Sequence, residues 1–427
     1  MINEFLGFAG DVKIEELKIT SIPTANVMTI TNQVIGMEIY EDLFSPFISG
    51  YVVLQESLDI LNNLPLTGQE WLEMKVRTPT LEDADAIRGL FYVYKISERE
   101  FVAEKNVVYK LHFISVEAMF DSGNKYSKGF EGKISDIARQ HLEKFTSRIG
   151  VVEPTKNNTK YISNYWSPVK NLNFLTNNAI NQADSSTYLF FENRNGFNFM
   201  SLNAMYNGPE IQDFNYNFKA REIDPSTGES ARVVENDYKR ITEISLPTSF
   251  DTLTKMRKGT YASTLITHDL VSKRYRSRKF EYLDKFDTKT HLNSYPLTGI
   301  QMSGMFNPNT TIITNEIHYG VFNGYGDVSN SKNLQERLSD LSMAEGLKVI
   351  ITVPGRTDYT VGKKVSLKII KPEPLEEKDE YDDQEDKIFS GSYIIGAINH
   401  VISREDHTCT MELIKDSWAK NINRFNE

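Results

Sequence analysis

The sequence predicts a mainly β fold with minor α (α+β), built largely from antiparallel strands. Aromatic residues are abundant, with 21 Tyr and 24 Phe in 427 residues, and such side chains favour half-buried strand surfaces. Short runs of alternating apolar residues, bounded by Gly, Pro and charged turns, recur along the chain. The last cluster of such runs, residues 359–418, has a counterpart near the N-terminus. These three observations carry the prediction.

Length and charge limit the class of protein. A chain of 427 residues is expected to form roughly three units of about 150 residues each. The formal net charge of −10 argues against a protein that mainly grips nucleic acid, because phosphate binding needs clustered Lys and Arg. The single cysteine, Cys409, excludes an intrachain disulfide framework and a cysteine-based metal site. We also expect no secretory signal and no transmembrane helix.

The pattern of the first third of the chain predicts β-strands. Residues 13–57 contain several β-type runs, and residues 66–78 form another. Residues 80–88 form a loop with three carboxylates. Residues 89–119 then predict a long hairpin that turns near residues 103–106.

Two helices and a hairpin follow. Apolar residues recur at helical spacing from Ile134 to Phe145, with Ser135 as the expected N-cap. Ser167 and Pro168 open a second helix in the order typical of a cap and a first-turn proline. Residues 186–202 predict a β-hairpin, and residues 205–235 predict a polar connector.

The remaining residues alternate strands, loops and one helix. Strand character returns near residues 238–247, ahead of the basic run at 273–279. Residues 290–330 are rich in loop signals, and residues 332–345 predict a third helix. The closing strand cluster begins at Leu347.

An internal repeat relates the two strand clusters. Gly68 leads a strand that ends before a proline, and Gly362 does the same in the second cluster. Each strand is followed by an acidic loop and by a hairpin that starts at a glycine, Gly89 or Gly391. The match extends upstream if Gly50 corresponds to Gly259. The alternative is two unrelated antiparallel sheets. Duplicated modules would let a threefold oligomer present six equivalent faces.

No catalytic signature is present in the sequence. The seven histidines show no HExxH spacing, and His112 and His400 are expected to be strand residues rather than ligands. No nucleophile elbow, phosphate loop or dinucleotide fingerprint occurs. We therefore expect no enzyme activity, no catalytic residue, no metal and no cofactor.

Two charge runs are candidate partner interfaces. The acidic run at residues 373–386 lacks the glycine of a calcium loop, so it is either a solvated loop, a loop ordered against a partner or, less favoured, a metal site. The basic run alternates along a strand and so presents one face, either to solvent or to an acidic partner, with nucleic acid less favoured. The residues nominated for contact with partners are Arg274, Arg276, Arg278, Glu376, Glu377, Asp382 and Asp383.

The middle of the chain resembles a known family. Residues 165–183 are a proline-initiated helix, and residues 190–202 follow the hairpin pattern F-F-E-x-x-x-G-F-x-F-x-S-L. Together with residues 126–145 and the cluster at 347–418, they resemble central baseplate hub proteins of contractile-tailed bacteriophages. This family is shared with the spike proteins of type VI secretion systems. The resemblance implies a homotrimer with two tube-type antiparallel β-barrel modules per chain, which form a pseudo-sixfold ring.

The resemblance and the repeat together divide the chain. Residues 1–120 are expected to form the first tube-type module, and residues 121–235 a helix and hairpin insert domain. Residues 236–290 and 340–420 are expected to form the second module, with 291–339 as a loop-rich insertion.

The expected function is structural. The chain would be the hub of a phage tail baseplate, joining the tail tube to the central spike and lining part of the DNA channel. Expected partners are further copies of itself, the spike, the tube or tube-initiator proteins and the baseplate wedges. Its place would be the virion, after synthesis in the host cytoplasm, with no stable membrane insertion. The alternatives are the hub of a bacterial contractile injection system or, less favoured, a cell-wall-degrading tail enzyme.

Overall fold

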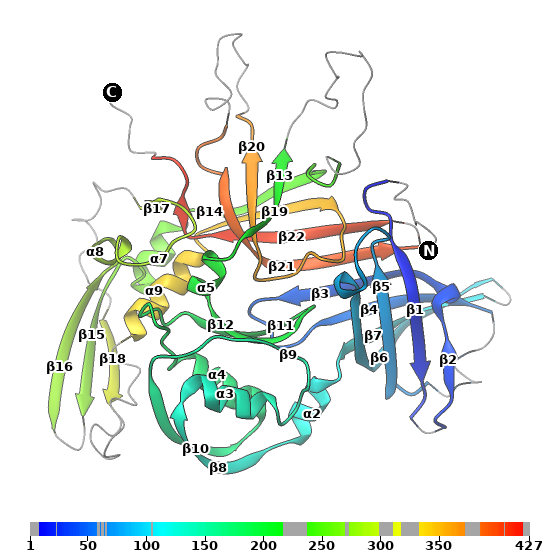
Figure 1. The fold of residues 1–427 in the computed structure, drawn as a ribbon, viewed down its shortest axis with the longest axis horizontal. Helices are drawn as coiled ribbons and strands as arrows, with labels where there is room; N and C mark the ends of the chain where they lie inside the picture. The colour runs from blue at the N-terminus through cyan, green and yellow to red at the C-terminus, as the bar shows by residue number, and fades with distance from the viewer. Residues whose placement is uncertain are drawn as a thin grey trace, which may run out of the picture.

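A computed structural model describes most of the chain and confirms the mainly β fold with minor α (Figure 1). The described residues are 8–22, 24–57, 60, 64, 66–103, 106–216, 237–269, 273–298, 311–316, 333–371, 385–404 and 406–421. Within them, no helix is long and apolar enough to cross a membrane.

The first strand set occupies the N-terminal part of the chain. It consists of β3 (Val34–Asp42), β4 (Ser49–Glu56), β5 (Glu70–Arg77), β6 (Ile87–Ala103) and β7 (Asn106–Ser115). These strands pair in the order β5-β6-β7-β4-β3, all antiparallel. Two further strands, β1 (Lys13–Thr20) and β2 (Val27–Thr29), extend the sheet beyond β5. The 3-10 turns η1 (Thr31–Gln33) and η2 (Asp83–Asp85) lie in the connections.

The second strand set repeats this order. It consists of β14 (Glu243–Ser249), β19 (Leu347–Pro354), β20 (Lys364–Ile369), β21 (Gly391–Ser403) and β22 (His407–Lys415). These strands pair in the order β20-β21-β22-β19-β14, again antiparallel. Taken in chain order, each strand has the same neighbours as its counterpart in the first set. A further strand, β13 (Glu210–Tyr216), adds to β20 in parallel, and it falls in the segment expected to be a connector.

The glycine pair that suggested the repeat has one backbone conformation. Gly68 and Gly362 each precede the first residue of their strand by two positions, with φ of 79° and 80°. Glycine adopts this left-handed region without a steric penalty. The upstream match does not hold, because Gly50 lies inside β4 whereas Gly259 ends helix α7 (Thr252–Lys258). The counterpart of β4 by pairing is β19.

The two sets are joined because β21 changes partner along its length. Residues 391–394 pair with β20, and residues 397–403 pair with residues 36–42 of β3. The register shifts between Ile395 and Ala397, and the carbonyl of Gly396 accepts the N–H of Leu43 at 2.9 Å. A bulge of this kind bends a strand and ends one pairing before another starts. All thirteen strands therefore form one sheet, and the pairings among the described strands follow an open path rather than a closed ring.

The insert domain covers one side of this joint and lies at the bottom of Figure 1. Its strands are β8 (Tyr126–Lys133), β9 (Ile149–Val152), β10 (Asn158–Trp166), β11 (Tyr188–Asn193) and β12 (Gly196–Ser201). Its helices are α2 (Glu117–Gly123), α3 (Ile134–Leu142), α4 (Pro168–Thr176) and α5 (Leu202–Tyr206). The hydroxyl of Ser167 accepts the N–H of Lys170 and caps α4 as expected.

The expected cap of α3 is wrong. Ser135 lies inside the first turn, where its N–H donates to the hydroxyl of Thr155 at 3.0 Å. The cap residue is Lys133, which makes no side-chain cap hydrogen bond. A hydroxyl from a neighbouring segment therefore satisfies a helix-end donor that sequence alone assigned to a local side chain.

A small outer sheet projects on the left of Figure 1. It contains β15 (Ala262–Asp269), β16 (Arg274–Glu281) and β18 (Thr311–Glu316), with β15 in the centre. Helices α7, α8 (Tyr282–Phe286) and α9 (Leu334–Ala344) lie between it and the large sheet. Strands β17 (Tyr295–Pro296) and β23 (Ser417–Trp418) form a short ladder.

The hydrophobic core of each strand set contains side chains that come from another part of the chain. Ile402 of β21 is buried in the core of the first set. Leu43, after β3, and Phe191, on β11, are buried in the core of the second set. Each fully buried side chain of this size contributes about 1.5–3 kcal/mol. The parts are therefore fastened by apolar packing as well as by the shared strand.

The close crossing at Gly50 gives a testable consequence. An added Cβ would lie 2.1 Å from the carbonyl oxygen of Glu38 and 2.6 Å from the ring of Phe113. Because one neighbour is backbone, Gly50→Ala is expected to lower the free energy of unfolding by about 1–3 kcal/mol. The control is Gly129→Ala, where nothing lies within 4 Å. Equal urea-unfolding midpoints for the two variants would contradict this packing.

Candidate functional site

The predicted partner residues fall on an edge strand and on an undescribed segment. Arg274, Arg276 and Arg278 alternate along β16, whose described pairing is to β15 only. The side chains of Arg276 and Arg278 are exposed. The nominated acidic residues Glu376, Glu377, Asp382 and Asp383 lie outside the described residues. The structure therefore places the two basic side chains on an exposed strand and leaves their role as a prediction.

A buried carboxylate, that of Glu192, ties the insert domain to the first strand set. It accepts the N–H of Ile48 at 2.8 Å and the hydroxyl of Ser115 at 2.5 Å. Its second oxygen accepts from the guanidinium of Arg148, which also pairs with Glu117 at 3.0 Å. The side chain of Glu192 has no exposed area. Every contact to it is a donor, which is the arrangement that an ionised carboxylate satisfies.

A second buried carboxylate, that of Glu41, ties the end of β3 to the loop before β20. It accepts the hydroxyl of Thr360 and, at 3.1 Å, the N–H of Val361. Burial raises the pKa of both Glu41 and Glu192 to about 7, against the hydrogen bonds that lower them. We call Glu41, Glu192 and Arg148 the junction network. It lies where the two strand sets and the insert domain meet.

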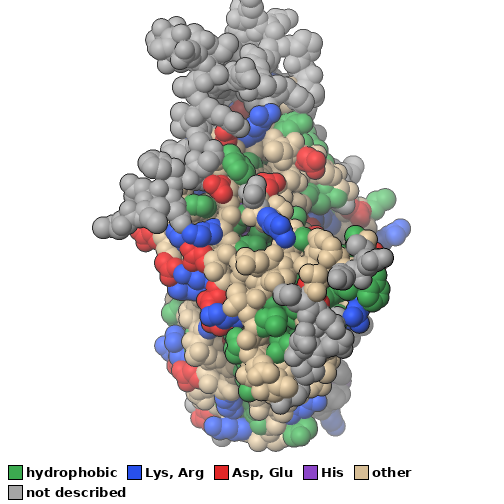
Figure 2. All heavy atoms as spheres, turned by 90° about the vertical axis from the view of Figure 1, so that its right-hand side faces the viewer, with side chains coloured by type: hydrophobic (Ala, Val, Ile, Leu, Met, Phe, Trp, Pro, Cys, Tyr) green, Lys and Arg blue, Asp and Glu red, His purple; other side chains and the backbone are tan. Residues whose placement is uncertain are grey.

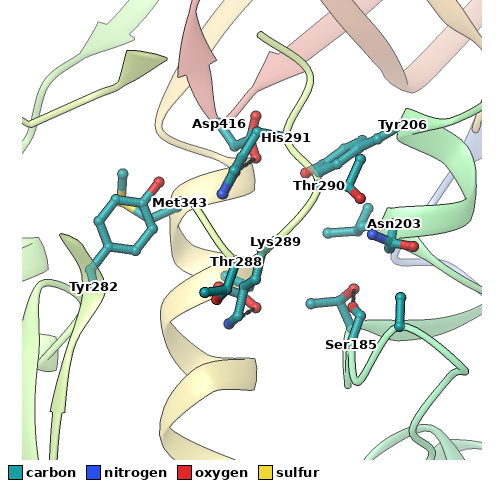
Figure 3. Close-up of a pocket in the computed structure, with 14 residues that line it drawn as sticks. Ser185, Asn203, Tyr206, Tyr282, Thr288, Lys289, Thr290, His291, Met343 and Asp416 are labelled. Atoms are coloured by element: carbon teal, nitrogen blue, oxygen red, sulfur yellow. Dashed lines mark hydrogen bonds and ion pairs between the residues drawn. The ribbon is translucent and has the colours of Figure 1, made fainter. Parts of the chain in front are cut away.

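A small cavity lies between the insert domain, helices α8 and α9, residues 288–291 and the residue that follows β22, and Figure 3 shows its lining. The ring of His291 stacks on Phe286, with 3.8 Å between centroids. Its Nδ1 lies 2.7 Å from Asp416, and its Nε2 donates to the carbonyl of Phe286 at 3.1 Å. Lys289 pairs with Asp340 at 2.8 Å, and burial raises the pKa of that carboxyl.

The cavity is lined by a serine, a histidine and an aspartate, the residue types of a nucleophilic triad, but these side chains do not have the hydrogen bonds of a triad. Ser185, His291 and Asp416 all line it. A triad needs the Nε2 atom free to take the serine proton. Here Nε2 faces a backbone carbonyl, and the Ser185 hydroxyl pairs with that of Thr187 at 3.0 Å. The volume of about 50 Å³ is also far smaller than ligand pockets of about 300–1,000 Å³.

Among the described residues, one group of metal-type ligands converges: His400, His407 and Cys409, all buried. The Nδ1 atom of His400 lies 3.0 Å from the Nε2 atom of His407. The sulfur of Cys409 lies 3.3 Å and 3.4 Å from these two atoms. Burial lowers the pKa of His400 to about 3, lowers the pKa of His407 well below its usual range, and raises the pKa of the Cys409 thiol.

Sequence reasoning missed this group, because it excluded a cysteine-based metal site on the count of one cysteine and did not consider one thiolate combined with two imidazoles. His400 and Cys409 are directly opposite in the β21–β22 ladder, and His407 precedes Cys409 by two positions on the same strand face. The signal is thus a cross-strand pair plus an alternate residue, which depends on the hairpin register. The expectation that His112 and His400 lie in strands is confirmed, because they lie in β7 and β21, whereas the expectation that neither is a ligand stays a prediction.

Figure 2 views the molecule from the side of β1 and β2. Acidic and basic side chains are interspersed over the visible face, with apolar side chains between them. Local ion pairs on this side include Glu15 with Lys75 at 2.8 Å and with Arg77 at 2.7 Å. Mixed charge of this kind lacks the single-sign stripe that binds a phosphate backbone.

Solved structures of two tail proteins have the same fold as this chain. The tail protein from Neisseria meningitidis MC58 matches with a TM-score of 0.54 and 11% identity, over 96% of this chain and 97% of that chain. The 43 kDa tail protein of prophage MuSo2 from Shewanella oneidensis matches with a TM-score of 0.52 and 7% identity, over 94% and 98%. No family model and no curated protein matches the sequence. At these identities the likeness shows the fold alone, and at that level the expected resemblance is confirmed.

The junction carboxylates predict a pH-dependent stability. Between about pH 4.5 and pH 7 the folded chain holds a proton on Glu41 that the unfolded chain releases, so the free energy of unfolding falls as pH rises. Glu41→Gln keeps an oxygen acceptor for Thr360 and Val361 but cannot ionise. Its free energy of unfolding, minus that of the wild type, is expected to rise by on the order of 1–3 kcal/mol from pH 5 to pH 8.

The control for this measurement is Glu131→Gln, which changes an exposed carboxylate paired with Lys160. Exposed pairs contribute about 0–1 kcal/mol, so no comparable change is expected. Urea unfolding at both pH values measures the differences. A pH-independent difference between Glu41→Gln and the wild type would show that Glu41 is not the titrating group.

Proposed function

We propose that the chain is a structural protein of a phage tail baseplate: a homotrimeric central hub that joins the sixfold tail tube to the threefold spike. In this role it resides in the virion, contacts the spike, the tube or tube-initiator proteins and the baseplate wedges, and lines part of the DNA channel. The observation that carries the proposal is the repeated strand order, together with one unequal feature of the two sets.

The unequal feature is the second half of the long hairpin strand. In the second set, residues 397–403 of β21 run past β20 and pair with β3 of the first set. In the first set, β6 likewise runs past β5, whose last partner is Val93. The continuation of β6, residues 95–103, pairs with β7 on one side, and no described strand lies on its other side.

The missing neighbour of β6 is identified by the strand order. The partner of β21 is β3, and the counterpart of β3 in the second set is β14. Among the described strands, β14 pairs only with β19, so no described strand lies at its outer edge. The β6 continuation of one copy would therefore pair with β14 of the next copy. Three copies repeat this contact and close a ring of six strand sets.

Exposed apolar side chains lie on the β6 continuation, on β14 and on helix α7, which follows β14 in the chain. Phe101 and Val102, on the β6 continuation, are 73% and 62% exposed. Leu246 on β14 and Leu253 on α7 are 43% and 69% exposed. Exposed strand edges with apolar side chains favour pairing with another chain. Pro247 in β14 lacks an N–H, so this ladder is expected to be shorter than that between β3 and β21.

The charge of the chain suits a channel through which DNA passes. Its net charge is −10, and counterion release by clustered Lys and Arg is what fixes proteins to DNA. An acidic ring would let the polymer slide without a stable complex.

Native mass measurement tests the ring. The purified chain at micromolar concentration is expected at three times the 48.9 kDa of one chain, with an interface of roughly 2,000 Å² or more per contact. Phe101→Lys is expected to give a folded monomer, because it places a charge in the β6 edge. Tyr165→Lys, on β10 and 67% exposed, is the matched control and should leave the trimer intact. A stable monomer of the wild-type chain at micromolar concentration would contradict the proposed trimer.

Charge reversal tests the basic strand separately. Arg276→Glu with Arg278→Glu is expected to block assembly with baseplate partners while leaving the free energy of unfolding within about 0.5 kcal/mol of the wild type. Lys133→Glu with Arg139→Glu changes the same charge at two exposed positions of the insert domain. Sedimentation of assembled particles and circular dichroism are the readouts. Normal assembly would assign the β16 arginines to a merely solvated face.

A further inference from the structure

The side-chain group His400, His407 and Cys409 brings together ligand-type atoms that the hub role does not require. It lies inside the β21–β22 hairpin, with all three residues at 0% exposure. The three ligand-type atoms lie within 4.8 Å of one another. They come from the two strands of one regular ladder, so their positions are set by backbone pairing rather than by a loop.

Hydrogen bonding alone does not satisfy this arrangement. Each ring nitrogen has one in-plane position, which holds either a hydrogen or a lone pair. The Nδ1 atom of His400 and the Nε2 atom of His407 each face two partners, namely each other and the Cys409 sulfur. Three mutual contacts therefore cannot all contain a well-aligned hydrogen. Three lone pairs converging on one cation would use all three atoms at once.

The triangle of atoms also has the size of a coordination sphere. Zinc binds nitrogen at about 2.0–2.1 Å and thiolate sulfur at about 2.3 Å, so tetrahedral angles place two nitrogens about 3.3 Å apart and nitrogen and sulfur about 3.6 Å apart. The observed separations of 3.0 Å, 3.3 Å and 3.4 Å are slightly smaller. A displacement of about 0.2–0.3 Å per contact would admit the ion.

The surroundings hold the ligands in place. Gly355 lies against the ring of His407, where an added Cβ would be 2.3 Å from ring carbons. The N–H of Gly355 donates to the carbonyl of His407 at 2.7 Å, and the N–H of His407 donates to the carbonyl of Gly10 at 2.8 Å.

We propose that His400, His407 and Cys409 bind one divalent transition-metal ion of the zinc class. The two imidazole nitrogens and one thiolate are a ligand set that suits Zn²⁺ and its spectroscopic substitute Co²⁺. On binding, the Cys409 thiol releases its proton to solvent and a metal–sulfur bond forms. The fourth position of a tetrahedral ion is left for a small ligand such as water. The site fastens β22 to the strand that joins the two sets.

Metal content and a cobalt spectrum test the site on the untagged full-length chain. Purification without chelator is expected to yield about one zinc-class ion per chain by mass spectrometry of the elements. After stripping, titration with Co²⁺ should produce a thiolate-to-cobalt charge-transfer band that saturates at one equivalent. Cys409 is the chain's single cysteine, so this band reports the site in the wild type without any variant.

Variants assign the ligands. Cys409→Ser is expected to abolish the band, and His400→Gln and His407→Gln to weaken Co²⁺ binding by more than about 100-fold. His112→Gln, on β7, is the histidine control and should leave the spectrum unchanged. Circular dichroism and Tm report whether each variant folds. The proposal is overturned if the folded wild type carries no stoichiometric metal and shows no cobalt band, or if the band persists in Cys409→Ser.

Discussion

The pairing of β21 with β3 is the constraint on which the rest of the structure depends. It merges two strand sets from opposite ends of the chain into one sheet. Because of the bulge at Gly396, β21 pairs with β20 before the bulge and with β3 after it. The side chains next to this pairing are buried across it. Ile402 of β21 packs in the core of the first set, and Leu43, which follows β3, packs in the core of the second set. Neither set completes its core without residues from the other.

The hydrogen bonds of the junction network fix how the two strand sets and the insert domain are placed relative to one another. Apolar packing alone is not directional and would allow several placements. Buried charges contribute little net stability, because their loss of solvation offsets their pairing. Glu192 nevertheless finds donors from three segments, and Glu41 finds them at the loop before β20. Sliding either set by one residue would leave a buried carboxylate without its donors. That cost favours one relative placement of the parts.

Sequence predicted the local elements and much of their order, but not the contacts between parts. Alternation and turn residues located the hairpins, Ser167 and Pro168 marked α4, and the glycines at 68 and 362 marked equivalent strand entries. The β3–β21 pairing, the parallel pairs of β13 and β18, and the convergence at Cys409 depend on register between distant segments. Glu41 and Glu192 were hidden among 58 acidic residues, because burial leaves no mark on residue type.

The two strand sets share a backbone plan while their side chains differ, and this combination suits a symmetry adaptor. On the proposed ring, six similar strand sets would offer a sixfold frame to the tube. Features found in only one set would recur three times. The buried group at His400, His407 and Cys409 is such a feature, whereas His112 in the first set pairs with Ser97 at 2.7 Å and faces the surface region. Equal backbones with unequal side chains thus give one ring two symmetries, each available to a different partner.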